Sequence, residues 1–275
     1  MNPLRRIPTL WRTVRHLQPA QGWAQIVHGL QGHPQQAPEQ IAPEFSKGPA
    51  PQPFLDGPAH ACWHEGNVLE LIRQRVDFSS GVDWSHAAAG PLWAYHLHNC
   101  DHLRSPALSA ERRTELILDW VQNHTSGVGW DPHPISLRLV SWGKLLLRSD
   151  QLSLDDVKRA AISASMARQA ETLQANLEIR LQANHLLSNL VALVFMGLLF
   201  SGPQAERWLA KASSLIDEMA LQFNEDGGHE ERSPMYHGVL LEHLLEHLAL
   251  LFGQLARVVP ASEHQHKIEL LTQSG

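Results

Sequence analysis

The sequence predicts an all-α protein built from antiparallel pairs of helices. From Gly90 onward, apolar residues recur every three or four positions, which is the period of a helix. Short loops that contain glycine or proline separate these stretches. No window shows the sustained alternation of a β-strand. Helices joined in this way form a bundle, a solenoid or a ring of helical hairpins.

The composition is that of a globular protein and argues against several functions. Of the 275 residues, 43% are hydrophobic, which is enough for a large core. A net charge of -6 and a pI near 6.3 argue against nucleic acid as a partner. Two cysteines do not make a disulfide scaffold. The apolar run 186–200 is too short to span a bilayer, so we expect a buried helix and no transmembrane segment.

We expect three regions along the chain. Residues 1–30 form a basic amphipathic helical segment, without the continuous apolar stretch of a signal peptide. We therefore favour the cytoplasm over the periplasm of a bacterium. Residues 31–53 are rich in proline and predict an extended linker. Residues 54–275 form the helical domain, although its first part is poorly patterned and predicts at most a short helix at 68–76.

The helices of this domain follow from apolar spacing and from their end signals. Ser109 is placed to cap one helix, and Ser153 with Asp156 resembles a capping box that opens another. Gly202 and Pro203 mark a break between two long apolar stretches. The expected helices cover residues 90–103, 109–121, 135–148, 153–175, 186–200, 203–223 and 236–258.

The most polar loop of the chain runs over residues 224–237, between two apolar helices. Glycines 227 and 228 permit a tight turn, and Pro234 is favoured in a first helical turn. A loop dense in acids, bases and donors, held by rigid elements, is typical of a functional site. Its candidate residues are His229, Glu230, Glu231, Arg232, Tyr236 and His237.

Asn184 and His185 form a second polar pair, which opens the most apolar stretch of the chain. Polar groups that enter such a segment must either be hydrogen-bonded or face a cavity. The pair is therefore either part of a helix-start hydrogen-bond network or part of a site.

We expect no metal and no other cofactor. His98 and His102 have the i,i+4 spacing of metal ligands, but no carboxylate motif accompanies them, and a polar helix face is the simpler interpretation. The stretch 243–247 fits the zinc pattern H-x-x-E-H. It lies within an amphipathic repeat of Leu, Glu and His, so we assign His243 and His247 to a solvated helix face.

Four blocks of sequence carry a family resemblance: residues 91–98, 130–138 with Trp142, 184–200 and 226–237. Together they resemble the heparinase II/III family of polysaccharide lyases over roughly residues 90–250. The resemblance implies an incomplete (α/α) toroid of antiparallel helical hairpins, which the family pairs with a C-terminal β-sandwich. It also implies β-elimination on uronic-acid polysaccharides, as in heparinases and alginate lyases.

The resemblance places catalytic roles on three residues. Asn184 and His185 would neutralise the uronate carboxylate, and Tyr236 would be the acid/base. Removal of the C5 proton of a uronate puts extra negative charge beside a carboxylate, which explains why such donors are needed. Arg138 is either a clamp for a substrate carboxylate or part of a structural ion pair. The other substrate-binding candidates are His98, Trp142, His229, Glu231, Arg232 and His237.

Two departures from the family pattern leave substrate preference open. Glu230 stands where the family usually has an aromatic residue, and Asn99–Cys100 replace an aromatic pair. We also expect that no β-sandwich lies within these 275 residues and that such a domain acts in cis or in trans. The predicted function is a uronate-polysaccharide lyase with an acidic polysaccharide or oligosaccharide as its partner. The alternative is a noncatalytic toroid that binds acidic glycan or serves polysaccharide assembly.

Overall fold

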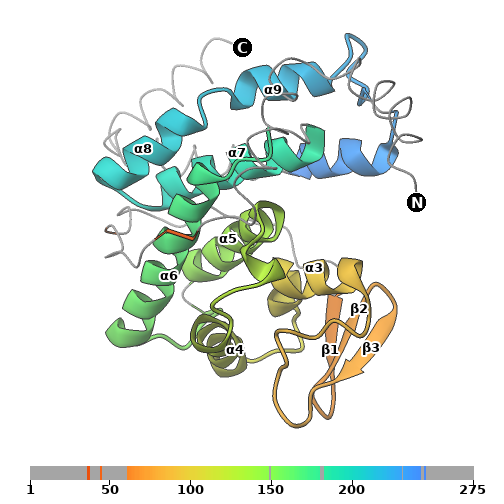
Figure 1. Cartoon of the computed structure of the whole chain (residues 1–275), viewed down its shortest axis with the longest axis vertical. Helices are drawn as coiled ribbons and strands as arrows, with labels where there is room; N and C mark the ends of the chain where they lie inside the picture. Colours follow the sequence, from red (N-terminus) through yellow and green to blue (C-terminus); the bar gives the residue numbers. More distant parts are fainter. Residues whose placement is uncertain are drawn as a thin grey trace, which may run out of the picture.

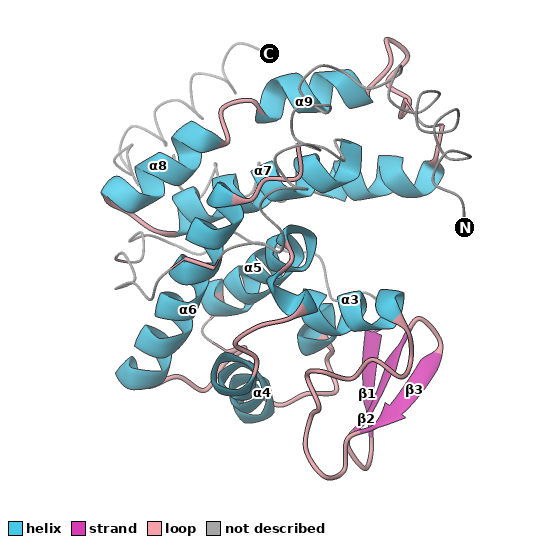
Figure 2. Cartoon of the chain, in the orientation of Figure 1, coloured by secondary structure: helices cyan, strands magenta, loops and turns pink. Residues whose placement is uncertain are grey.

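The computed structural model describes residues 36–37, 44, 61–148, 150–179, 183–230, 232–242 and 245. This part of the chain is mostly helical, as predicted, with one small sheet (Figures 1 and 2). The helices are α3 (Pro91–Asn99), α4 (Ala110–Asn123), α5 (Pro132–Leu147), α6 (Asp156–Ala175), α7 (Ala183–Leu199), α8 (Pro203–Lys211) and α9 (Leu215–Gln222), with 3-10 turns η2 (Asp101–Arg104) and η3 (Val128–Trp130) and strands β1 (Ala61–His64), β2 (Val68–Leu71) and β3 (Gln74–Asp77). A further helix begins at residue 234.

The helices pack in two rows, because each contacts the next but one along the chain. Contacts join α3 to α5, α5 to α7 and α7 to α9 in one row, and α4 to α6 and α6 to α8 in the other. Contacts between α5 and α6, α6 and α7, and α7 and α8 connect the rows. Alternate helices in two layers are the arrangement of helical hairpins in an incomplete (α/α) toroid, which confirms the predicted fold class.

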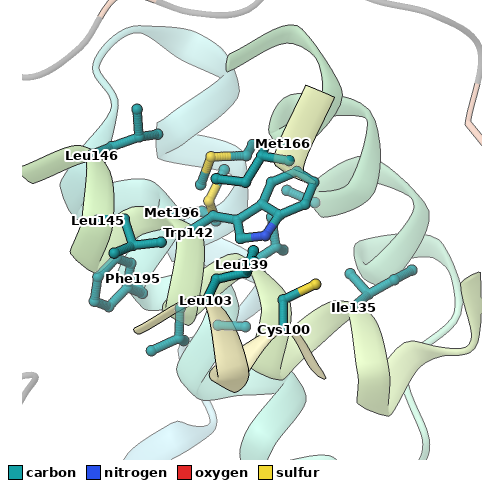
Figure 3. Close-up of a cluster of buried hydrophobic side chains, with 14 of the residues drawn as sticks. Cys100, Leu103, Ile135, Leu139, Trp142, Leu145, Leu146, Met166, Phe195 and Met196 are labelled. Carbon is teal, nitrogen blue, oxygen red and sulfur yellow. The ribbon is translucent and has the colours of Figure 1, made fainter. Parts of the chain in front are cut away.

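The core is densest where α5 meets α7. Both helices are apolar around most of their circumference, as a helix buried on several sides must be. Figure 3 shows Trp142 of α5 among Met166 of α6 and Met196 of α7. Gly143 allows the close approach, since a Cβ there would lie 2.3 Å from a ring carbon of Phe195. None of the described helices is both long and apolar enough to cross a membrane.

Local sequence signals set most helix ends. The Ser109 hydroxyl accepts a hydrogen bond from the Arg112 amide, as predicted for the cap of α4. The cap of α6 is Asp155, which accepts from the Lys158 amide, and not the predicted pair of Ser153 and Asp156. Ser153 instead donates its amide hydrogen to the Thr114 hydroxyl of α4.

The first part of the domain is a β-meander, so the expected short helix at 68–76 is wrong. Strands β1, β2 and β3 pair antiparallel in that order, with Leu69 opposite both Trp63 and Val76. The turn from β2 to β3 places Ile72 and Arg73 at φ 45° and 65°. A two-residue hairpin turn favours such angles, but Asn-Gly is its usual sequence. Buried Leu69 and Leu71 face the core, and α3 packs against β2.

The helix expected over 203–223 is two helices. α8 ends at Lys211 and α9 begins at Leu215, with the chain turning at residues 212–214. The Ala212 amide donates to the carbonyls of both Trp208 and Leu209, which tightens the last turn of α8. This bend lets α8 pack on α6 while α9 packs on α7.

Two short pieces of the expected linker lie on the helices. The Arg168 guanidinium of α6 donates to the Ala37 carbonyl (2.9 Å) and to Gln36 Oε1 (2.8 Å). The Glu44 carbonyl accepts from the amide of Ser201 (2.9 Å). The remainder of 31–53 and the expected helix within 1–30 lie outside the described residues, so the proposed division of the chain stays a prediction.

Candidate functional site

Asn184 and His185 lie in the first turn of α7, where a helix presents unpaired amide hydrogens and the positive end of its dipole. The His185 side chain is 41% exposed. The Asn184 Oδ1 atom is buried and has no hydrogen-bond partner in the described part of the chain. Asn184 therefore keeps an unused acceptor oxygen, beside a helix start whose dipole favours an anion.

A buried carboxylate, which the sequence did not suggest, holds the His185 ring. Glu178 Oε1 lies 3.1 Å from His185 Nδ1. Asn189, one helical turn further along α7, donates to Glu178 Oε2 (3.1 Å) and accepts from the Glu178 amide (2.8 Å). Asn189 also donates to the Ser136 hydroxyl of α5 (3.1 Å), which ties the group to the neighbouring helix. The orientation of His185 is thus fixed by a polar network inside the fold.

His133 completes this cluster from the start of α5. Its ring stacks on that of His185, with centroids 4.4 Å apart and planes 35° apart. Burial lowers the pKa of His133 to about 4; the charge of His185 lowers it further, Glu178 opposes this, and His96 adds a smaller lowering. Burial acts to raise the pKa of Glu178, but the hydrogen bonds of His185 and Asn189 and the charges of His185 and His133 together outweigh it, and the net pKa is lowered. An ionised carboxylate thus lies between two imidazoles.

The polar loop after α9 is a tight hairpin. Phe223 and His229 form an isolated antiparallel bridge, and the Asn224 amide donates to the Gly228 carbonyl (2.8 Å). Gly227 adopts φ 79°, the left-handed angle that the glycine pair was expected to supply. Arg232 also has a positive φ of 52° and donates its amide hydrogen to the His229 carbonyl (2.8 Å).

Tyr236 stands in the first turn of the helix that follows this hairpin. Its amide donates to the hydroxyl of Ser233, as in an N-cap (3.3 Å). The Tyr236 ring lies 5.6 Å from that of His229, and the ring of His237 lies 6.0 Å from that of Phe223. His229 is buried at 4% exposure. The hairpin therefore fixes Tyr236 through His229, and these two predicted residues do come together.

The helix that carries Tyr236 is anchored further along. Leu240 is fully buried in the core, and Glu242 lies 3.9 Å from the ammonium of Lys144 on α5. The backbone around Tyr236 is thus held at both ends, by the hairpin and by α5.

Arg138 is inside the core. Its guanidinium donates to Gln169 Oε1 (2.8 Å) and to the carbonyls of His98 (2.9 Å) and Gly129 (2.8 Å). Its central carbon lies 4.0 Å from the ring centroid of Trp120. Burial lowers the pKa of Arg138 only to about 10, so it stays charged at neutral pH. This geometry favours a structural role over a substrate clamp, although the partners are neutral and not an ion pair.

His98 and Trp142 are also fully buried. His98 Nδ1 accepts from the Trp120 indole (3.2 Å), and its ring stacks on His124 at 4.2 Å. Desolvation, together with the charges of His124 and Arg138, lowers the pKa of His98 to about 2. Trp142 packs edge-to-face on Trp120. Both residues support the core around Arg138.

The expected pairing of His98 with His102 on one helix face is wrong, because α3 ends at Asn99 and Cys100 turns left-handed at φ 59°. His102 lies in η2, where its Nδ1 accepts from the Trp63 indole (3.0 Å) and its Nε2 donates to the Leu97 carbonyl (3.1 Å). Glu231 and the stretch 243–247, apart from residue 245, lie outside the described residues.

Two members of the cluster at the start of α7, His133 and Glu178, were not among the residues predicted for the site. His133 lies within the block 130–138, which carries part of the family resemblance and was singled out for Arg138. Its place in that block was a weak signal for a role in the site. Glu178 belongs to no recognisable pattern, because its role depends on the loop that carries it back to Asn189. Only the fold could show this contact.

Comparison with known proteins assigns the class. A family model described as the heparinase II/III N-terminus matches residues 93–268, well over half of the chain. The chain therefore belongs to the heparinase II/III family, as its sequence blocks suggested. This membership supports a polysaccharide-lyase type of function at the level of the family.

One solved structure is similar in sequence and fold to a limited degree: the crystal structure of heparan sulfate lyase HepC from Pedobacter heparinus. The identity is 18% and the TM-score 0.47, with 75% of this chain and 34% of that chain covered. This chain thus spans about a third of the length of that enzyme. No curated protein sequence matches the chain.

Proposed function

We propose that this chain is the helical part of a polysaccharide lyase that breaks uronic-acid glycans by β-elimination. The observation that carries the proposal is the pair Asn184–His185 in the first turn of α7, with His185 held by buried Glu178. Family membership supports the reaction class, and the geometry of the pair supports a site for an anion.

β-Elimination from a uronate requires a site that binds its carboxylate. Removal of the C5 proton of a uronate builds negative charge on a carbon that already bears a carboxylate. Preorganised donors aimed at that carboxylate stabilise the transition state. Asn184 and His185 are donors of the required type, and the amide hydrogens and dipole at the start of α7 add to them. Glu178 acts as a positioning residue, because its contact with His185 Nδ1 orients the imidazole ring.

Tyr236 is the proposed acid/base. A positioned phenol can take the C5 proton or give a proton to the leaving oxygen. Support comes from its place in a first helical turn, held by the contact with His229 and by the Ser233 cap. Arg232 and His237 of the same loop are proposed to contact the substrate, with Glu231 as a further candidate, while buried His229 holds the Tyr236 ring in place. Arg138, His98 and Trp142 are proposed to stabilise the core between α3, α5 and α6 and not to touch the substrate.

We further propose that a β-sandwich domain, in cis or in trans, completes the site. Without a second wall, water enters, and hydrogen-bond donors lose the low-dielectric setting that makes them effective. The chain alone is then expected to bind acidic oligosaccharides but to turn them over weakly. Joined with a β-sandwich domain of the family, it is expected to make unsaturated products that absorb ultraviolet light.

The test is Tyr236→Phe in that two-domain protein. Loss of an acid/base should lower kcat by about 100-fold or more with little change in KM, because the hydroxyl acts in the transition state. Tyr95→Phe is a matched control: Tyr95, the other tyrosine of the chain, donates its hydroxyl to Asp131 Oδ2 (2.9 Å). Near-full activity of Tyr236→Phe would reject the assignment.

The second candidate function is a noncatalytic toroid that binds acidic glycan or serves polysaccharide assembly. It is favoured only if no member of a panel of acidic glycans gains unsaturated ends while the two-domain protein still retains the polymer. Asn184→Ala and His185→Ala separate the two candidates: in the lyase they should lower kcat, and in the binding protein they can change only affinity.

A further inference from the structure

Three side chains from three different segments converge beside the start of α7. They are His133 from α5, Glu178 from the loop that precedes α7, and His185 from α7 itself. One potential ligand atom from each lies within 4.8 Å of the other two. Among the described residues, these three form the group of His, Cys, Asp and Glu side chains that lie close enough together to bind one metal ion.

Two features of the group are unfavourable unless something binds there. The His133 Nδ1 atom is buried and has no hydrogen-bond partner among the described residues, which costs free energy. The Glu178 carboxylate is 9% exposed and pairs with His185, which is a cation only when protonated. A positive ion between the three groups would pair the carboxylate and use the nitrogen lone pairs.

The scaffold behind these groups is already ordered. Asn189 donates to Glu178 Oε2 and accepts from the Glu178 amide, so that Oε1 is directed to His185. Such outer contacts are what orient ligands in metal sites. His133 and His185 are fixed by their positions in the first turns of two helices that pack against each other.

We propose that His133, Glu178 and His185 form a binding site for a divalent transition-metal ion such as Zn²⁺. Two imidazole nitrogens and one carboxylate oxygen suit Zn²⁺, and imidazole ligands favour it over Mg²⁺ and Ca²⁺. Three protein ligands leave a fourth position for water or another oxygen ligand. This proposal departs from the expectation of no metal, which the sequence favoured because the three residues lie far apart in the chain and follow no metal-binding spacing.

The metal site does not require that the chain be a lyase, so the two proposals can fail separately. His185 Nδ1 faces Glu178, so an ion between them would take the place of their direct contact. The ion would then fix the His185 ring by a bond where the apo site fixes it by a hydrogen bond.

The experiment is titration of the metal-free full chain with ZnCl₂ by calorimetry, together with the visible absorption of the Co²⁺-loaded protein. We expect about one equivalent of tight binding and a Co²⁺ spectrum typical of few-coordinate nitrogen and oxygen ligation. His133→Ala, Glu178→Gln and His185→Ala should each weaken binding by about tenfold or more. Circular dichroism checks that each variant is folded, and half-exposed His185 is the position most tolerant of replacement.

A matched control is available on the surface. His64 Nε2 contacts Glu70 Oε2 at 2.9 Å, a histidine–carboxylate pair outside the proposed group. His64→Ala should leave Zn²⁺ binding unchanged.

Three results would overturn the proposal: no Zn²⁺ binding to the chain, unchanged binding in folded His185→Ala and Glu178→Gln, or preference for Ca²⁺ over Zn²⁺. Binding that is lost instead in His243→Ala would place the metal on the H-x-x-E-H stretch.

Discussion

At the scale of single residues, the guanidinium of Arg138 shows how a permanent charge is accommodated in a helical core. Each of its three nitrogens donates to a different acceptor of the protein, and its plane lies over the indole of Trp120. Arginine suits this position because its planar fork offers several fixed donors and stacks on aromatic rings. The acceptors come from three separate segments, so the side chain joins α5 to α3, to η3 and to α6.

Arg138→Ala should therefore destabilise the fold. The substitution leaves buried acceptors without donors and opens a cavity, so we expect a loss of about 3 kcal/mol or more in the free energy of unfolding. Arg75→Ala removes an arginine that is 65% exposed and paired with Glu70, and should cost less than about 1 kcal/mol. Urea unfolding followed by circular dichroism measures both. Equal small losses would show that Arg138 is dispensable to the core and reopen its role as a substrate clamp.

At the scale of elements, close packing of α5 on α7 depends on one glycine. Phe195 of α7 occupies the space where a Cβ of Gly143 would be. A helix interior otherwise disfavours glycine, so its presence in the middle of α5 is explained by the contact with α7 and not by local preference.

Two glycine substitutions should have opposite effects. Gly143→Ala forces a buried aromatic ring to move and should destabilise the protein by about 1–3 kcal/mol. Gly238→Ala places a methyl group where no atom lies within 4 Å, in the helix that follows Pro234, and should stabilise by up to about 1 kcal/mol. Thermal unfolding of the two variants compares them directly. A stable Gly143→Ala protein would mean that the two helices can separate without cost.

At the scale of the whole molecule, buried neutral histidines tie stability to pH. Burial lowers the pKa of His102 from its ordinary 6.5 to about 4, and the hydrogen bond to Leu97 and the charge of Asp101 oppose this shift only partly. Burial also lowers the pKa values of His98 and His124. In the unfolded chain each imidazole returns to a pKa of about 6.5. Between pH 6.5 and 4 the unfolded state thus binds more protons than the folded state.

Stability should consequently fall as the pH falls through this window. The stability that comes from keeping His102 neutral is fully present above the pKa of the unfolded state. Below that pKa, each such histidine lowers the free energy of unfolding by up to about 1.4 kcal/mol per pH unit. Urea midpoints at pH 7.5, 6 and 5 measure the slope. His102→Gln should make the slope shallower, since one proton-linked group is gone. Stability that does not change between pH 7.5 and 5 would contradict the burial of these rings.

Much of the fold follows from the sequence because the helix signals are local. The spacing of apolar residues, the Ser109 cap and the Gly202–Pro203 break depend on neighbours within a few positions, so most of the described helices and the all-α class were predicted correctly. The four sequence blocks that resemble the heparinase II/III family predicted the toroid. The predictions failed where local preference and tertiary contact disagree: the β2–β3 hairpin has a turn of Ile72 and Arg73, and the break between α8 and α9 contains no glycine or proline.

The sequence by itself determined the helical class, the family and the polar loop that carries Tyr236. Only the tertiary structure decided which polar residues are available to a ligand. Arg138 and His98 are chemically suited to a substrate site but lie at 0% exposure in the core, whereas Glu178, which had no motif, holds His185. The reason is physical: whether a charge is satisfied by the protein or left for a ligand depends on groups that the fold brings together from distant segments, and this information is not contained in local spacing.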